Sequence, residues 1–352
     1  MDNPKISVII SIYNGEKDVH IMLDSLIAQS FGDIEYILID NGSEDNTRAV
    51  CQSYADRDKR FRVEVIEKNI GYIRARNVGL TLAKGEYITF ADADDFLSED
   101  AYKIMYDSVS KADADMLIAP YNLVYPDGKI VNKPLNLAKG TYEKEKIEEI
   151  LLPAFFGGNK DRVRIEGFMW RMLFRREIVD KTHNIFYEEA KPKEDQIFNQ
   201  LHSINCEKIE VIDYPVYNYI INENSVTAKI ISSFDYKDVW DKNLFLFDKS
   251  VLNADKANAY DKLENSICLN VYSTVYTMVI NTVKSIKMSN IKRVAKEFEE
   301  LFDCKYVKLM YRNLRGLRNS FIDKMILNAV EKNKYRFLFL KIKILQKLSG
   351  RC

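Results

Sequence analysis

Strand-like and helix-like patterns alternate over the first 120 residues, and this alternation constrains the fold more than any other feature of the sequence. Apolar runs rich in β-branched residues recur there, separated by segments with apolar residues at helical spacing. The expected strands are KISVIISIY, IEYILID, FRVEVIE, YITFA and ADMLIAPYNLV, and the expected helices cover about 17–28, 46–54, 72–83 and 98–111. Such alternation is typical of βαβ units, so we expect an α/β fold with one doubly wound, mostly parallel sheet and helices on both faces.

The rest of the chain follows a different pattern, in which a mixed region of strands and helices is followed by helices alone. Asp127-Gly128 predicts a hairpin turn, GFMWRMLF, KIEVID and PVYNYII read as strands, and KEDQIFNQLHSI reads as a helix. From about Phe234 onward the pattern is helical. Since 352 residues exceed one ordinary hydrophobic core, we predict two domains: residues 1–230 with the sheet, and residues 231–352 all helical.

Several signatures are absent from the sequence, and each absence narrows the class of protein. No G-x-G-x-x-G follows the first strand and no G-x-x-x-x-G-K-[ST] occurs, which argues against a nicotinamide dinucleotide site and a P-loop. The five Cys are scattered without a CxxC pair, so we expect thiols in a reducing compartment and no zinc site. With no signal-like N-terminus and no apolar run long enough to span a membrane, we expect a cytoplasmic protein.

Polar side chains follow each of the first four expected strands at the point where the strand ends. They are Tyr13, Asn14 and Glu16 after the first strand, Asp40 and Asn41 after the second, Asn69, Arg74 and Arg76 after the third, and Asp92, Asp94 and Asp95 after the fourth. The carboxyl ends of parallel strands meet at one edge of a sheet, where ligands of open α/β sheets bind. We therefore expect these side chains to share one cleft.

The three aspartates after the fourth strand repel one another and therefore need a counter-charge. Mg²⁺ and Mn²⁺ prefer oxygen ligands, and Mg²⁺ often leaves part of its coordination shell to substrate phosphates. The motif ADADD thus predicts a divalent metal ion, Mn²⁺ or Mg²⁺, together with a diphosphate ligand. The alternative is that these acids only cap the helix that is expected to begin at Ser98.

Seven motifs occur in an order and at a spacing that resemble family 2 glycosyltransferases with the GT-A fold. The motifs are ISVIISIYNGE, IEYILIDNGSEDNT, NIGYIRARNVGL, AKGEYITFADADDF, GFMWRMLFRREI, KEDQIF and NENSVTAK, and they cover roughly residues 5–230. The most similar subgroup builds bacterial capsular, exopolysaccharide or teichoic-acid glycans. The resemblance implies a GT-A domain and an inverting transfer from a nucleotide-sugar, usually a UDP-sugar, to a glycan or a lipid-linked saccharide, with Mg²⁺ or Mn²⁺.

The resemblance also implies roles for individual residues, position by position. The implied donor-binding residues are Tyr13, Asn14, Glu16, Asp40, Asn41, Arg76, Asp94 and Ser225, and the implied metal ligands are Asp94 and Asp95. Asp195 of the pair Glu194-Asp195 is the implied catalytic base. The alternative is that both acids only stabilise the first turn of a helix, where the helix dipole favours negative charge. Asn41 stands where the family usually has Asp, and its carbonyl oxygen can still accept a hydrogen bond from a nucleotide base.

Two further features concern the acceptor and the location of the protein. Trp170 could stack on a sugar or belong to the core, and Arg171 could contact an acceptor's phosphate or be solvated surface. Residues 305–352 hold thirteen Lys or Arg against two acids, mixed with apolar residues at near-helical spacing. This pattern predicts either helices that lie on an anionic membrane surface, at the inner face of the cell membrane, or a packed helical subdomain.

Two other functions stay open at this point. A sugar-nucleotidyltransferase shares a doubly wound sheet and an acidic metal site, but its Gly-rich loop with Arg and Lys after the first strand is missing here. A non-catalytic nucleotide-sugar-binding protein at the membrane would keep the donor site without turnover. No motif indicates nucleic-acid binding.

Overall fold

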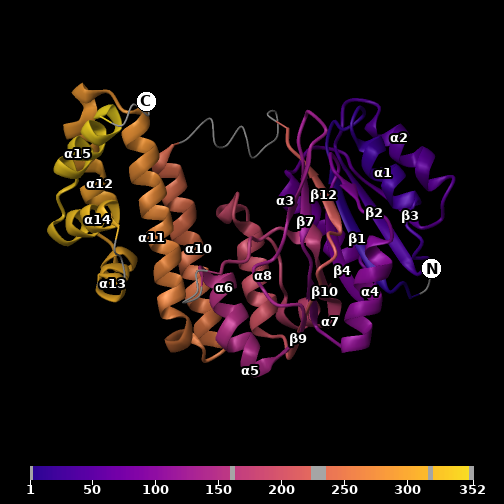
Figure 1. The fold of residues 1–352 in the computed structure, drawn as a ribbon. Coiled ribbons are helices and arrows are strands. Elements are labelled where there is room, and N and C mark those ends of the chain that lie inside the picture. Colours follow the sequence, from indigo (N-terminus) through magenta and orange to yellow (C-terminus); the bar gives the residue numbers. More distant parts are fainter. Residues whose placement is uncertain (1–2, 159–162, 223–234, 316–319, 349–352) are drawn as a thin grey trace. The chain divides into compact units, whose positions relative to one another are not determined.

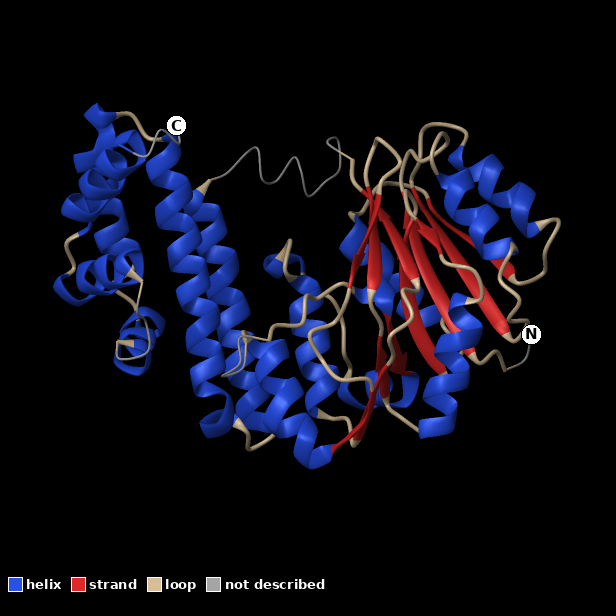
Figure 2. Ribbon diagram, viewed as in Figure 1, coloured by secondary structure: helices blue, strands red, loops and turns tan. Residues whose placement is uncertain are grey.

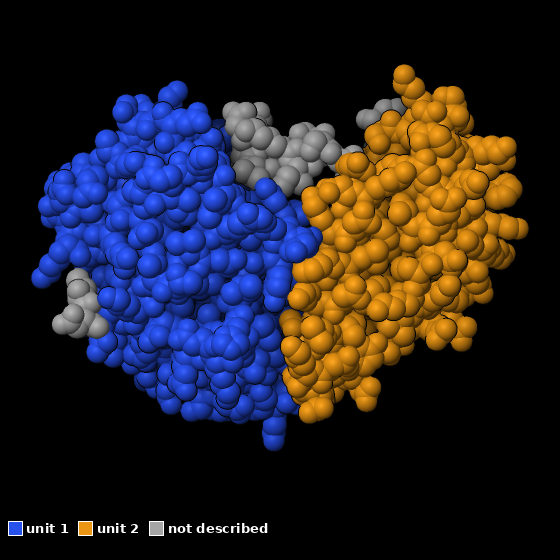
Figure 3. Space-filling view, turned by 180° about the vertical axis from the view of Figure 1, so that it is seen from behind, with its two compact units in different colours: residues 1–155, 165–232 blue, residues 156–164, 233–352 orange. Residues whose placement is uncertain are grey.

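The computed structural model describes residues 3–158, 163–222, 235–315 and 320–348. The chain separates into two compact units, residues 1–155 with 165–232 and residues 156–164 with 233–352 (Figure 3). Every strand of the described residues belongs to the first unit, and the second unit is helical where it is described. The described residues 156–158, 163 and 164 cluster with the second unit, a separation that no pattern in the sequence indicated.

An eight-stranded sheet forms the centre of the first unit (Figures 1 and 2). Its strands are β1 (Ile6–Ile12), β2 (Ile34–Asn41), β3 (Phe61–Ile66), β4 (Tyr87–Asp92), β6 (Met116–Ile118), β9 (Gly140–Glu143), β10 (Met172–Arg175) and β11 (Lys208–Val211). Their order is β3-β2-β1-β4-β10-β6-β11-β9. β1 to β4 are mutually parallel, whereas β10 runs antiparallel to β4 and β6, and β9 to β11. The predicted mostly parallel sheet is confirmed.

Helices cover both faces of this sheet, as expected. The connecting helices are α1 (Val19–Ile27), α2 (Thr47–Ala55), α3 (Tyr72–Leu82) and α4 (Ala101–Ala112), and α5 (Lys144–Lys146), α6 (Leu152–Phe156), α7 (Arg176–Thr182) and α8 (Glu194–Ile204) follow. The apolar residues of α1, α2 and α4 share one buried cluster with Ile6, Val8 and Ile10 of β1. α3 lies on the other face, where a Cβ on Gly79 would come within 2.3 Å of Ile9 Cγ2. Only glycine lets α3 approach the sheet this closely.

A smaller, four-stranded sheet has the order β5-β12-β7-β8. Its strands are β5 (Phe96–Leu97), β7 (Tyr121–Val124), β8 (Ile130–Lys133) and β12 (Tyr217–Ile220). The single strand predicted for ADMLIAPYNLV is wrong, because this segment forms β6 and β7 in two different sheets. Pro120 separates them, since proline donates no ladder hydrogen bond and restricts the residue before it.

Two local predictions at helix and strand starts also need correction. α4 begins at Ala101 without a cap from Ser98. Ser98 is instead engaged with the small sheet, because its N–H donates to Val216 O (2.9 Å) and its hydroxyl accepts from Asn218 Nδ2 (3.2 Å). The expected strand GFMWRMLF starts with a 3₁₀ turn, Met169–Arg171, before β10.

The second unit is built from α10 (Tyr236–Lys256), α11 (Tyr260–Ser285), α12 (Ile291–Leu301), α13 (Lys305–Leu314), α14 (Phe321–Lys332) and α15 (Tyr335–Leu348). In the basic stretch after residue 305, α13 packs on α11 and α15 on α12, and Met310 and Phe339 are fully buried. Most apolar residues of this stretch therefore form a core, as in the packed alternative. No helix among the described residues combines the length and the apolar character that crossing a membrane requires.

Candidate active site

Two loops at the carboxyl edge of the sheet hold each other through bonds between side chains and backbone. Asn14, in the loop after β1, donates its N–H to Ser43 Oγ (3.1 Å) and accepts from Glu44 N–H through Oδ1 (2.9 Å). Glu16 accepts from Asn46 N–H through Oε2 (2.8 Å). Asn14 has φ of 50°, a left-handed conformation that asparagine tolerates better than most residues. Asn14 and Glu16 thus fix the shape of this edge.

The implied donor residues at the end of β2 are buried and engaged. Asp40 accepts from Arg48 Nε through Oδ2 (2.9 Å). Asn41 donates from Nδ2 to Asn69 Oδ1 (3.1 Å) and accepts from Ile70 N–H through Oδ1 (3.0 Å). An aspartate could make only the second of these bonds in its ionised form, which accounts physically for asparagine at this position.

The three aspartates after β4 have unlike surroundings. Asp95 is buried, with 1% of the residue exposed; its Oδ1 accepts from Ile220 N–H (2.7 Å) and its Oδ2 has no hydrogen-bond partner. Asp94 is exposed, as is Tyr13 on the neighbouring loop. Burial and the charge of Asp92 raise the pKa of Asp95 to about 9. The pKa of Asp94 is raised as well, because neighbouring atoms partly desolvate its carboxyl group, although the residue reaches solvent, and because Asp92 is charged. Ser11 near the end of β1 pairs with Asp92, so the acids lie beside the loop after β1.

These surroundings fit a divalent cation. Without one, the carboxyls of Asp94 and Asp95 are driven toward protonation, and a cation would hold both of them ionised. The unpartnered Oδ2 of Asp95 and the exposed carboxylate of Asp94 are free acceptors of the type that Mg²⁺ and Mn²⁺ prefer. In the described part of the chain no three His, Cys, Asp or Glu side chains converge as a complete metal site.

Arg76 connects the acid cluster to the Glu194-Asp195 pair. Its Nη2 lies 2.8 Å from Asp92 Oδ1 at the end of β4, and its Nη1 lies 3.2 Å from Asp195 Oδ1 at the start of α8. Although burial lowers the pKa of Arg76, the charges of Asp195 and Asp92 raise it above the usual value, so the guanidinium is firmly charged. Arg76 thus bridges two acids that are 103 residues apart in sequence. The nucleotide contact that the sequence resemblance implies for Arg76 stays a prediction.

Glu194 and Asp195 lie side by side with different partners. Glu194 is buried, and its Oε1 accepts from the Tyr72 hydroxyl (2.7 Å). Burial foremost, together with the charges of Glu194 and Asp92, raises the pKa of Asp195, and Arg76 opposes this shift. Tyr72 is a residue that the sequence analysis missed. It precedes Arg76 by one helical turn on α3, and that spacing was the available signal.

The two predicted acceptor residues belong to a buried aromatic cluster. The Trp170 ring stacks on Tyr217 (4.3 Å between centroids, 12° between planes), and the guanidinium of Arg171 lies 5.4 Å from the Tyr121 ring. Both Trp170 and Arg171 are buried, so Arg171 is not the solvated surface residue that one of the two predictions described. The cluster adjoins the acids, because Asp92 N–H donates to the Tyr217 hydroxyl (2.9 Å). Ser225, the remaining implied donor residue, lies outside the described residues.

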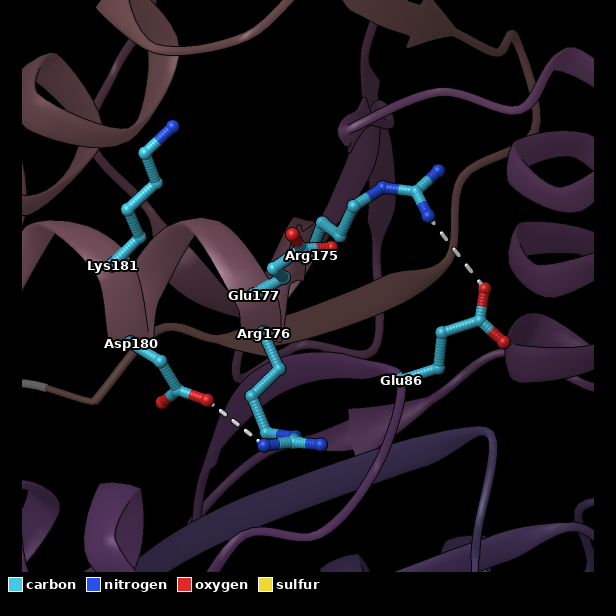
Figure 4. Close-up of a pocket in the computed structure, with 6 residues that line it drawn as sticks. All are labelled: Glu86, Arg175, Arg176, Glu177, Asp180 and Lys181. Atoms are coloured by element: carbon cyan, nitrogen blue, oxygen red, sulfur yellow. Dashed lines mark hydrogen bonds and ion pairs between the residues drawn. The ribbon is translucent and has the colours of Figure 1, made fainter.

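A charged hollow at the opposite edge of the sheet is unrelated to these residues (Figure 4). It is lined by Glu86, Arg175, Arg176, Glu177, Asp180 and Lys181. Glu86 directly precedes β4, whereas Asp92 ends it, so the hollow lies at the amino edge of the sheet. Both arginines that line it form ion pairs, Arg175 with Asp115 (3.0 Å) and Arg176 with Asp180 (2.8 Å).

The fold is that of a known class of enzymes. The structure of residues 1–349 of TarS from S. aureus, in complex with UDP, superposes with a TM-score of 0.70 at 18% identity, covering 98% of this chain and 92% of that one. The mannosyltransferase PcManGT from Pyrobaculum calidifontis, in complex with GDP-Man and Mn²⁺, gives a TM-score of 0.50 at 14% identity, covering 90% and 88% of the two chains. The protein thus has the GT-A glycosyltransferase fold with an additional helical unit.

Sequence comparison identifies the family. The family model described as glycosyl transferase family 2 matches residues 7–181. A Bacillus subtilis protein described as the uncharacterized glycosyltransferase EpsJ is 30% identical over 241 residues, which is 68% of this chain and 67% of EpsJ. The chain belongs to glycosyltransferase family 2 and is a glycosyltransferase, so the nucleotidyltransferase and non-catalytic alternatives are set aside.

Proposed function

We propose that the protein transfers a sugar with inversion from a UDP-sugar to a glycan or lipid-linked saccharide in the synthesis of a cell-surface polysaccharide. The observation that carries this proposal is the Arg76 bridge, which brings Asp195 of α8 next to the acid cluster after β4. Two comparisons support a UDP-sugar as the donor and a role in the synthesis of a cell-surface polysaccharide. A structure of TarS is in complex with UDP-GlcNAc, and TarS is a poly(ribitol-phosphate) β-N-acetylglucosaminyltransferase, 26% identical to this chain over 261 residues.

In this proposal Asp195 is the general base. The attacking hydroxyl of the acceptor must lose its proton, and a carboxylate within hydrogen-bond reach contributes about 10²–10⁴-fold to such a step. Asp195 is suited to the task because its raised pKa makes it a better proton acceptor than an ordinary aspartate. Arg76 fixes its orientation through Oδ1, and Glu194, held by Tyr72, supports the start of α8.

The donor side combines the loops after β1 and β2 with the aspartates after β4. Asp94 and Asp95 are the residues that would hold Mn²⁺ or Mg²⁺, and the cation would offset the charge that develops on the departing diphosphate. Tyr13, Asn14 and Asp40 then line the nucleoside side of the same edge, together with the implied donor residues around them. Ser225 keeps its assignment as a donor residue from the sequence resemblance alone.

We place the enzyme peripherally on the inner face of the cell membrane, where lipid-linked acceptors lie. The support comes from α15, where Phe337 and Ile344 are 65% and 54% exposed on the side away from the buried Phe339. Lys341 lies between them and is also exposed. Apolar residues flanked by cations on a helix surface are typical of binding to anionic lipid headgroups.

The test is UDP release and sugar transfer by the purified chain, using a panel of UDP- and GDP-sugars with Mn²⁺ and lipid extracts as acceptors. We expect one UDP-sugar to support turnover, and EDTA to abolish it. The variant Asp195→Asn should lose about 10²–10⁴-fold in kcat while it binds UDP as the wild type does in calorimetry. Asp107→Asn, which changes an exposed aspartate of α4, is the matched control. Full activity of Asp195→Asn would remove Asp195 as the base.

A further inference from the structure

The segment that contains residues 166–168 runs directly alongside the proposed base. A Cβ on Gly167 would lie 3.4 Å from Asp195 Cβ and 3.4 Å from Gln196 N, so the backbone at Gly167 contacts the first turn of α8. Asn199, one turn later on α8, donates from Nδ2 to Gly167 O (3.0 Å). Glu166 and Phe168, which flank Gly167 in the sequence, are therefore held at a fixed place beside Asp195.

Phe168 is the exposed end of a rigid stack of rings. It is 36% exposed, whereas Trp170 and Tyr217 behind it are buried. The ring of Phe168 lies parallel to Trp170 (5.0 Å, 7°), and Trp170 lies parallel to Tyr217 (4.3 Å, 12°). Tyr121 packs edge-on against both Phe168 (5.6 Å, 77°) and Trp170 (4.9 Å, 75°). The orientation of the Phe168 ring is thus fixed before any ligand arrives.

Glu166 places a carboxylate at the same position. Its side chain is exposed, and Oε2 accepts from the Tyr121 hydroxyl (3.1 Å). Its backbone is held as well, because the buried Arg171 donates from Nη2 to Glu166 O (2.8 Å). The guanidinium of Arg171 lies 5.7 Å from the centre of the Phe168 ring, so one buried cation supports both the ring and the carboxylate.

An exposed aromatic ring beside an exposed carboxylate matches the chemistry of a sugar ring. The electron-rich face of the aromatic ring attracts the polarised C–H groups of a pyranose, and the carboxylate accepts hydrogen bonds from its hydroxyls. We propose that Phe168 and Glu166 form the acceptor subsite and bind a pyranose whose hydroxyl points at Asp195. Trp170 and Arg171, predicted to touch the acceptor, are positioning residues for this subsite. The inference rests on the proposed function, because it takes Asp195 as the base.

The experiment compares Phe168 variants of the full chain in the transfer reaction. Octyl pyranosides of glucose, galactose and N-acetylglucosamine serve as acceptor probes, with ribitol 5-phosphate as a probe that lacks a ring. Phe168→Ala should raise the KM for the pyranoside about tenfold, since it removes the stacking face. The KM for the donor and the slow hydrolysis of the donor without acceptor should stay unchanged.

Two further variants separate stacking from folding and size. Phe168→Tyr keeps the ring and should bind the pyranoside as the wild type does, whereas Phe168→Leu keeps much of the volume and should behave like Phe168→Ala. Ile27→Ala is the control, because Ile27 is 37% exposed at the end of α1, on the opposite edge of the sheet. UDP binding by calorimetry shows that each variant is folded.

Several outcomes would overturn the inference and leave the proposed function standing. These are an unchanged KM for the pyranoside in both Phe168→Ala and Phe168→Leu, or transfer by the wild type to ribitol 5-phosphate and to no pyranoside. If the wild type neither releases UDP nor transfers to any probe or lipid extract, the proposed function itself fails, and the acceptor subsite fails with it.

Discussion

Arg76 has a larger role than its sequence context indicates. The motif around it implies a contact to the nucleotide, which stays a prediction, and in the structure its two terminal nitrogens form ion pairs with Asp92 and Asp195. That geometry needs α3, β4 and α8 to meet, and no local pattern encodes the meeting of segments so far apart in the chain. The acid residues themselves were predictable, because each follows a strand or begins a helix whose pattern is clear.

The charge of Glu194 contributes to the raised pKa of Asp195. A base works only when it is deprotonated, so the transfer rate should rise with pH through this raised pKa. In Glu194→Gln the neighbouring charge is absent, the pKa of Asp195 falls, and the acidic limb of the kcat/KM profile should move to lower pH. The profile of UDP release against pH measures this.

Glutamine can still bond to the Tyr72 hydroxyl, so the structure at the start of α8 should be preserved in this variant. Tyr72→Phe, which removes that bond and keeps the Glu194 charge, is the companion variant. An acidic limb at the same pH in the wild type and in Glu194→Gln would show that Asp195 is not influenced by this charge.

At the scale of elements, periodicity predicted the alternating strands and helices of the first unit because burial on both faces of β1 leaves long apolar runs. The prediction from periodicity failed where a single residue divides an apolar run. The segment with β6 and β7 is continuous in hydrophobicity, and only Pro120 indicates that its halves enter different sheets. The 3₁₀ turn at Met169–Arg171 is likewise hidden in an apolar run, although it determines that Trp170 points into the core and Phe168 toward solvent.

The close approach of α3 to β1 gives a test of the packing that places Arg76. Gly79→Ala would bring a methyl group within 2.3 Å of Ile9 Cγ2. Overpacking of this kind costs about 1–3 kcal/mol, and the better helix propensity of alanine returns at most about 1 kcal/mol. We expect a lower free energy of unfolding in urea denaturation. Arg76, one turn away, should then lose part of its hold on Asp195, which lowers kcat.

Gly32→Ala is the matched control, since a Cβ at Gly32 meets no atom within 4 Å. Both changes affect the unfolded chain in the same way, so the difference between them reports the contact with Ile9 together with the helix propensity that alanine gains only at position 79. Equal stability of the two variants would contradict the tight packing of α3 on the sheet.

At the scale of the whole molecule, the charge asymmetry of the sequence has a structural counterpart in the second unit. Residues 305–352 hold thirteen Lys or Arg, and those that the structure describes lie on or beside helices whose inner sides form a core. The sequence thus predicted the charge but could not divide the apolar residues between core and surface. That division depends on which side of each helix α11 and α12 cover, and it leaves Phe337 and Ile344 of α15 outside.

Binding to membranes should depend on this outer side of α15. Phe337→Glu combined with Ile344→Glu should reduce co-sedimentation with phosphatidylglycerol vesicles at least tenfold, because burial of each apolar side chain contributes about 1.5–3 kcal/mol. Leu252→Glu is the control, an exposed apolar residue (42%) of α10. Equal sedimentation of the double variant and the control would exclude α15 as the membrane contact. If the double variant instead loses a dimer that the wild type forms in ultracentrifugation, the exposed side of α15 serves self-association.

The guanidinium shared by Asp92 and Asp195 has a consequence for attempts to redesign the enzyme. In the proposed mechanism one cation serves an acid on the donor's side and the acid on the acceptor's side. A substitution that changes selectivity for one substrate would then also alter the electric field at the other. Paired substitutions across this bridge should therefore depart from additivity, and variant libraries that randomise the two halves separately will miss the combinations that work.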